Sequence, residues 1–166
     1  MAGSGTATGA GVVGIADLKV LRHSGQLITH GLGSCVAVLG YDALREVGGL
    51  LHFVSPAAAK DPQEATRTPA TYADSGIKAL LWALQCAGAR KEHLRFHLVG
   101  GACMSGGAGV LNIGKKNVLA ARKALWSAGG LVESEHVGGT ASRTVRMDVA
   151  SGQVQLRLGT GELINL

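Results

Sequence analysis

The sequence predicts a single α+β domain with mixed or antiparallel, sandwich-like sheets flanked by two main helices. The expected order along the chain is four strands, a helix, a strand, a helix and two or three strands, which is not the strict alternation of a doubly wound sheet. No internal repeat divides the chain. Its 166 residues, 46% of them hydrophobic, are sufficient for one domain that folds without disulfides or metals.

Three segments are expected within the chain. Residues 1–12 are rich in glycine and small side chains and predict a flexible N-terminal tail, residues 13–158 predict the folded domain, and residues 159–166 predict a C-terminal extension. Glycine makes up 26 of the 166 residues, about twice its usual share. The glycines show no fixed period, so they predict local backbone roles and not a fibrous repeat.

Four strands are expected before the first helix. Apolar and β-branched residues predict them over residues 12–21, 26–30, 35–41 and 48–54. All three prolines then lie in residues 55–70, which predicts a long loop.

The first helix is expected to begin with a capping box formed by Thr71 and Asp74 and to end at Gly88. A strand over residues 94–99 and a glycine-rich loop over residues 100–109 follow it.

Asn112 is expected to cap a second helix, which stops at Gly129-Gly130. Trp82 and Trp126 lie in the two helices and are expected to be packing residues. Residues 131–158 predict two or three strands, with a hairpin turn at Ser151-Gly152.

Composition argues against several function classes. The three cysteines contain no C-x-x-C pair, which excludes a four-cysteine zinc site and a disulfide framework and predicts a cytoplasmic protein. A signal peptide and an apolar run of about 18 residues are both missing, so no membrane insertion is expected. The net charge of +5 comes from scattered Lys and Arg, with two residues each of Trp, Tyr and Phe, which argues against nucleic-acid binding.

No cofactor or metal is expected either. The fragments Gly31-x-Gly33 and Gly107-x-Gly109 lack the third glycine of a dinucleotide fingerprint. His93 and His97 are four residues apart, a spacing that separates them by about 13 Å along a strand.

Cys35 is the first candidate for chemistry. It follows Gly31-Leu32-Gly33-Ser34, where glycines allow the backbone to approach a ligand closely and to present N–H groups to a developing oxyanion. A thiol nucleophile also needs a base. Cys86 lies within the first helix and is interpreted as a core residue, and the role of Cys103 stays open.

The hairpin after the loop offers His52 as that base. If Asp42-Ala43-Leu44-Arg45 forms a four-residue turn, Tyr41 pairs with Glu46 and Cys35 lies directly opposite His52. Directly opposed residues share a face, with β-carbons about 4.5–5.5 Å apart. A histidine within an apolar strand is alternatively a core residue, and a slip of one residue would place the two on opposite faces.

Thr29 and His30 end the preceding strand. Thr29 is expected to hold the imidazole in one tautomer, the third role of a catalytic triad. Its alternative is an ordinary strand threonine, with His30 as the partner of the cysteine.

Six motifs containing these residues occur in order. They are Thr29-His-Gly-Leu-Gly-Ser-Cys35-Val-Ala-Val, Leu51-His52 followed by Pro56, Tyr72-Ala-Asp74-x-Gly76-Ile, Val99-Gly-Gly-Ala102-x-Met104, Asn112-Ile-Gly114-x-x-Asn117, and Gly138-Gly139 with Arg143-x-Val145. Together they resemble the CheD family, the chemoreceptor glutamine deamidases of bacterial and archaeal chemotaxis, from about Val13 to Arg157.

The resemblance implies a cysteine amidohydrolase that converts receptor glutamines to glutamate through a thioester and also hydrolyses glutamyl methyl esters. It implies Cys35 as nucleophile, His52 as base and Thr29 as the third catalytic residue, with Gly33 and Ser34 contacting the substrate. It further implies a fold akin to the catalytic domain of cytotoxic necrotizing factor toxins. The expected partners are the cytoplasmic region of chemoreceptors and a CheC-type phosphatase.

A second hypothesis is a non-catalytic regulatory module that binds a CheC-type phosphatase or the receptor array. The long loops motivate it, and in that case the thiol of Cys35 is dispensable.

Overall fold

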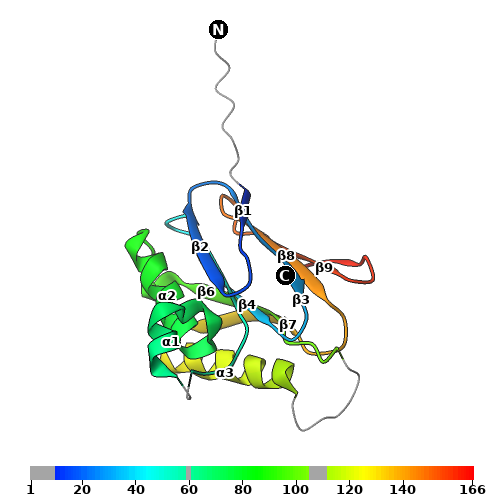
Figure 1. Ribbon diagram of the computed structural model, residues 1–166. Coiled ribbons are helices and arrows are strands. Elements are labelled where there is room, and N and C mark those ends of the chain that lie inside the picture. Colours follow the sequence, from blue (N-terminus) through cyan, green and yellow to red (C-terminus); the bar gives the residue numbers. More distant parts are fainter. Residues whose placement is uncertain (1–9, 59–60, 105–111) are drawn as a thin grey trace.

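The computed structural model describes residues 10–58, 61–104 and 112–166 (Figure 1). Its strands are β1 Ala10–Val12, β2 Asp17–Arg22, β3 Gln26–Leu32, β4 Val36–Asp42, β5 Val47–Phe53, β6 Arg95–Gly100, β7 Leu131–Val137, β8 Arg143–Asp148, β9 Val154–Leu158 and β10 Leu163–Asn165. Its α-helices are α1 Pro62–Arg67, α2 Ala73–Cys86 and α3 Ile113–Ser127, and two 3₁₀ turns are η1 Pro69–Thr71 and η2 Lys91–His93.

The strands form two mixed sheets. Sheet A has the order β1-β3-β8-β9-β10 and sheet B the order β2-β5-β4-β6-β7. One pair in each sheet is parallel, β1 with β3 and β6 with β7, and the others are antiparallel. The predicted α+β class with mixed sheets is therefore confirmed.

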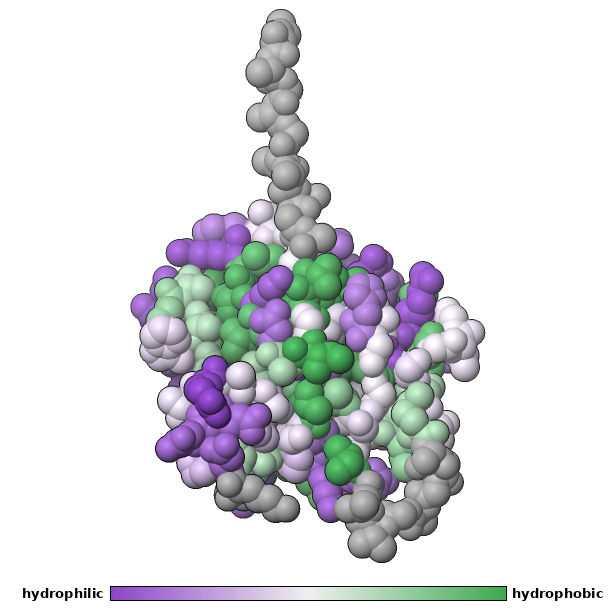
Figure 2. Space-filling view, in the orientation of Figure 1, coloured by the Kyte–Doolittle hydropathy of each residue, from purple (hydrophilic) through white to green (hydrophobic). Residues whose placement is uncertain are grey.

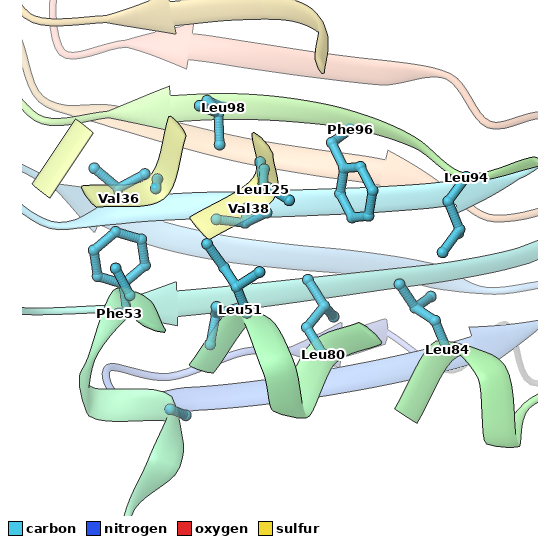
Figure 3. Close-up of a cluster of buried hydrophobic side chains, with 14 of the residues drawn as sticks. Val36, Val38, Leu51, Phe53, Leu80, Leu84, Leu94, Phe96, Leu98 and Leu125 are labelled. Atoms are coloured by element: carbon cyan, nitrogen blue, oxygen red, sulfur yellow. The ribbon is translucent and has the colours of Figure 1, made fainter. Parts of the chain in front are cut away.

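Sheet B is the middle of three layers. Helices α2 and α3 lie on one side of the molecule and strands β8 and β9 on the opposite side (Figure 1). One hydrophobic core joins sheet B to the helices, and Figure 3 shows Leu51 of β5 and Phe96 of β6 beside Leu80 and Leu84 of α2. A second core joins sheet B to sheet A and includes Leu39, Leu50 and Met147.

Burial on both faces explains the composition of the central strands. All seven residues of β5 and six of the seven in β4 are buried. Strands covered on both sides are apolar throughout and do not alternate between apolar and polar residues. A polar side chain in these strands is therefore placed inside the protein, and His52 is one of them.

The predicted strand over residues 12–21 is wrong, because the chain changes sheet within it. Strand β1 belongs to sheet A and β2 to sheet B, and the connection between them includes Ala16 with φ of +55°. The other predicted strands lie close to their expected positions, including β7, β8 and β9 with the hairpin turn at Ser151-Gly152. Strand β10 lies in the expected C-terminal extension and was not predicted.

The residues around the first predicted helix differ from the prediction in two ways. The loop predicted over residues 55–70 contains α1, which Asp61 caps and Pro62 begins, a position where proline is compatible with a helix. Residues 59 and 60 lie outside the described residues. Thr71 and Asp74 form no capping box: the N-cap of α2 is Tyr72, and backbone bonds between Ser55 and this segment tie the helix start to the end of β5.

Two side-chain assignments on the helices are also wrong. Trp82 is 70% and Trp126 83% exposed, so neither is a packing residue of the described core. Cys86 is exposed and not part of the core. The apolar face of α2 passes through Ile77, Leu80 and Leu84, and Trp82 and Cys86 are each two residues away from Leu84, which turns them to the opposite side of a helix.

Candidate active site

Thr29 and His52 meet across the two sheets. Thr29 lies in β3 of sheet A and His52 in β5 of sheet B, and both are buried. The hydroxyl oxygen Oγ1 of Thr29 lies 2.8 Å from Nδ1 of His52. The predicted pairing of these residues therefore exists as a hydrogen bond between layers.

The second bond of Thr29 determines the tautomer of His52. The Thr29 hydroxyl also lies 2.7 Å from the carbonyl oxygen of Val13, which can only accept. The single hydroxyl proton is donated to that carbonyl, so Nδ1 of His52 donates its proton to Oγ1. The neutral imidazole consequently has an unprotonated Nε2, which is buried and has no hydrogen-bond partner among the described residues.

Cys35 and His52 lie on the same face of sheet B, but not in the predicted register. Strand β4 pairs Ala37 with His52 and Val36 with Phe53, so Cys35 lies opposite Val54 and diagonal to His52. The hairpin turn starts one residue later than expected, after the pair Asp42 and Val47. The predicted register is wrong by two residues, and because side chains alternate with a period of two, the face is unchanged.

Diagonal neighbours on one face have Cα atoms about 7–8 Å apart, within reach of a long side chain such as histidine. Cys35 and His52 are not hydrogen-bonded in this structure. Catalytic hydrogen bonds are often long in the free state and tighten when substrate binds.

Burial keeps both candidate catalytic groups neutral. Desolvation raises the pKa of the Cys35 thiol, an effect that the backbone N–H of Cys35 partly opposes. Desolvation also lowers the pKa of His52. Both shifts favour the neutral forms of these groups, a protonated thiol and an uncharged imidazole.

The loop that carries Cys35 is held through three consecutive carbonyl groups. The carbonyl of Gly33 accepts from the N–H of Ala102 at 2.8 Å, and that of Cys35 accepts from the N–H of Gly101 at 2.8 Å. The carbonyl of Ser34 accepts from the side-chain amide of Asn117 at 2.9 Å. The backbone of Gly101 and Ala102 therefore lies directly against the loop that carries Cys35.

Asn117 is part of the fifth sequence motif, but no role was predicted for it. The residue is fully buried in α3 and also donates to the carbonyl of Val54 at 2.8 Å. The signal that could have found it is a polar residue on the apolar stripe that runs through Gly114, Ala121 and Leu125.

Gly33 and the exposed Met104 lie at the rim of the site. A β-carbon on Gly33 would lie 3.3 Å from Cγ of Met104, an exposed side chain, so these two residues border the loop together. The remainder of the predicted glycine loop, residues 105–109, lies outside the described residues. His30 is exposed and faces away from Thr29, and Cys103 is half-buried.

One family model matches more than half of the chain. The family model CheD, described as CheD chemotactic sensory transduction, matches residues 55–158. The chain belongs to the CheD family.

Individual CheD relatives match over most of their length. A probable chemoreceptor glutamine deamidase CheD of Solibacter usitatus is 42% identical over 147 residues, 88% of this chain and 87% of the relative. A second from Anaeromyxobacter dehalogenans is 42% identical over 148 residues, 89% of this chain and 93% of the relative. The chemoreceptor glutamine deamidase CheD of Thermotoga maritima is 36% identical over 156 residues, 93% of this chain and 96% of the relative.

The described part of this CheD chain has no group of three or more His, Cys, Asp or Glu side chains that could hold a metal ion. None of its described helices is long and apolar enough to span a membrane. A buried imidazole with an accepting nitrogen and a thiol lie on one sheet face, and these are the two groups that nucleophilic catalysis by a thiol and a general base uses.

Proposed function

We propose that this chain is a protein-glutamine deamidase that converts glutamines in the cytoplasmic region of chemoreceptors to glutamate. The observation that carries the proposal is the bond chain from Val13 through Thr29 to His52, which leaves Nε2 of His52 able to accept a proton on the face that carries Cys35. Family membership and the names of the relatives support the same activity.

The reaction begins when Nε2 of His52 takes the proton of the Cys35 thiol. The sulfur attacks the side-chain amide carbon of the glutamine, and the electron pair of the C=O bond moves to oxygen. Backbone N–H groups of Ser34 and Cys35 stabilise this oxyanion. When the C=O bond reforms, the C–N bond breaks, and His52 returns its proton to the leaving nitrogen, which departs as ammonia.

Hydrolysis of the thioester completes the cycle. His52 takes a proton from water as the water oxygen attacks the thioester carbon, and the C–S bond breaks. The sulfur regains a proton from His52, and the product is a glutamate side chain. A glutamyl methyl ester passes through the same acyl-enzyme with methanol as the leaving group, so methyl ester hydrolysis is proposed as a second reaction.

The remaining parts of the proposal concern location and partners. The substrate is a solvent-facing glutamine on a receptor helix, and the enzyme acts in the cytoplasm, where that part of a chemoreceptor lies. A CheC-type phosphatase is proposed as a regulatory partner. No cofactor is needed, because thiol, imidazole and water account for every bond.

The test is mass spectrometry of receptor cytoplasmic fragments incubated with the protein. Wild-type protein should add about one dalton at individual glutamines, the difference between an amide and an acid, and should release ammonia. Cys35→Ala should lower both to background, since the thioester cannot form. Undiminished deamidation by Cys35→Ala would overturn the mechanism, and full restoration of chemotaxis by that variant would favour a regulatory binding module instead.

A further inference from the structure

The peptide group between Ser34 and Cys35 is fixed by a side chain and not by the backbone. Its neighbours on either side are fixed by backbone donors, Ala102 N–H on the carbonyl of Gly33 and Gly101 N–H on that of Cys35. The carbonyl of Ser34 is instead held by a side chain, that of Asn117. It is the one of these three bonds that a substitution can remove without moving the backbone.

The orientation of the Asn117 amide is unambiguous. Both of its partners, the carbonyls of Ser34 and Val54, can only accept, so the NH₂ group must face them. The same amide joins the loop before Cys35 to Val54, the residue opposite Cys35 in the hairpin. Asn117 therefore ties the two strand ends that carry the nucleophile and the base.

Stability alone does not account for an asparagine at this position. Oδ1 of Asn117 is buried and has no hydrogen-bond partner among the described residues. A buried acceptor without a partner carries a desolvation penalty, which offsets part of what the two donated bonds contribute. The two donated bonds therefore matter through the geometry that they impose on the loop before Cys35 and not through stability alone.

A peptide unit is planar and trans, so its C=O and N–H groups point in opposite directions. Because Asn117 draws the carbonyl of Ser34 toward α3, the N–H of Cys35 in the same peptide unit points away from α3. That N–H lies toward the thiol of its own residue.

We propose that Asn117 is a positioning residue that aims the backbone N–H of Cys35 at the oxyanion formed when the thiol attacks a carbonyl carbon. The proposal rests on the proposed function, in which Cys35 forms a thioester. It predicts that loss of Asn117 impairs reactions of Cys35 that pass through an oxyanion and spares those that do not.

Two reagents distinguish reactions of the Cys35 sulfur that pass through an oxyanion from those that do not. Acetylation by p-nitrophenyl acetate passes through a tetrahedral oxyanion before the ester C–O bond breaks, whereas alkylation by iodoacetamide displaces iodide without one. Each rate is followed by mass spectrometry of the peptide that contains Cys35, because Cys86 is exposed and also reacts. The variants are Asn117→Ala and Asn117→Asp, the second of which keeps the shape and loses the donors.

The expected result for both variants is acetylation of Cys35 slowed at least tenfold, with alkylation within about threefold of wild type, since loss of an oxyanion donor itself costs about 10²–10³ in rate. With receptor fragments, kcat should fall in the same proportion and KM should stay close to the wild-type value. Rates are measured under conditions in which circular dichroism shows that the variant is folded. A result from either of the two Asn117 variants is sufficient for the test.

The control is Tyr41→Phe, which removes a half-buried side-chain donor, the bond from Tyr41 Oη to the carbonyl of Val149, at the end of strand β4 far from Cys35. It should leave both rates unchanged. Equal loss of acetylation and alkylation in the Asn117 variants, or loss of neither, would overturn the inference alone. Wild-type Cys35 that is alkylated but never acetylated would overturn the proposed function, and the inference with it.

Discussion

The hydroxyl of Thr29 lies between two buried partners, the carbonyl of Val13 and Nδ1 of His52. Because the carbonyl takes the only hydroxyl proton, the imidazole is held as the tautomer with a free Nε2. A residue that supplied no hydroxyl would leave the proton free to occupy either nitrogen. Thr29 thus orients the base of the proposed reaction through this hydrogen bond.

Thr29→Val tests this role, because valine has the shape of threonine without its hydroxyl. We expect kcat for deamidation to fall at least tenfold with KM little changed, since general acid–base catalysis contributes about 10²–10⁴ in rate. Thr29→Ser, which keeps the hydroxyl, should retain most of the activity. Equal kinetics for the valine and serine variants would show that the hydroxyl is unimportant.

The pKa of His52 predicts the pH dependence of the reaction. Burial lowers this pKa below its ordinary value of 6.5, so the neutral base persists into mildly acidic solution. We expect the acidic limb of kcat/KM to lie below pH 6.5. A limb centred above pH 6.5 would contradict this prediction.

The same shift affects stability with a defined sign. In the unfolded chain His52 takes up a proton near pH 6.5, whereas in the folded protein it does so only at lower pH. The unfolded state therefore binds more protons in this window, and the free energy of unfolding falls as pH decreases through it. Urea titrations at several pH values measure this loss, and rates should be compared only where the protein is folded.

At the level of elements, the first turn of α3 packs directly on the glycine segment that follows β6. A β-carbon on Gly114 would lie 2.5 Å from the carbonyl oxygens of both Gly101 and Ala102. The same helix then presents Asn117 to the loop of Cys35. The close approach permitted by Gly114 is therefore part of what positions the loop that carries Cys35.

Gly114→Ala should be destabilising, although alanine is ordinarily the better helix former. The clash is with backbone atoms that cannot move aside, so we expect a loss of about 1–3 kcal/mol in the free energy of unfolding, and lower activity. Gly14→Ala is the control, because nothing lies within 4 Å of a β-carbon there. Denaturant titration of both variants gives the comparison, and a stabilised Gly114→Ala would refute the packing argument.

The β4–β5 hairpin shows how far local patterns predict an element. The pair of apolar strands and the turn near Asp42 were predictable from β-branched residues and turn chemistry. The register was not, because Asp42 joins the ladder and its carboxylate accepts from the N–H groups of Leu44, Arg45 and Arg90. The bond from Arg90 comes from 48 residues away and is invisible to a local turn rule.

On the scale of the whole molecule, the chain ends on sheet A. Strand β10 pairs with β9, and Ile164 and Leu166 pack against the core between the two sheets. Residues 159–166 thus contribute contacts to the same core against which Cys35 packs. This core lies between sheet A, which contains Thr29, and sheet B, which contains His52.

Deletion of residues 159–166 should lower stability more than activity. Ile164 and Leu166 are half-buried, and a fully buried side chain of this size contributes about 1.5–3 kcal/mol, so the expected loss is ~2 kcal/mol in total. That corresponds to a fall in Tm of about 4–8 °C for a chain of this length. Calorimetry measures it, and an unchanged Tm would show that β10 adds nothing to the core.

Most elements could be predicted from the amino-acid sequence, as could the shared sheet face of Cys35 and His52, because hydrophobic period, turn residues and the two-residue alternation of strands are local properties. It could not reveal which sheet each strand joins, which nitrogen of His52 carries the proton, or that Asn117 bonds to the loop before Cys35. These depend on hydrogen bonds between residues 23, 63 and 83 positions apart. Such bonds form only when the three layers pack, and no pattern along the chain encodes their geometry directly.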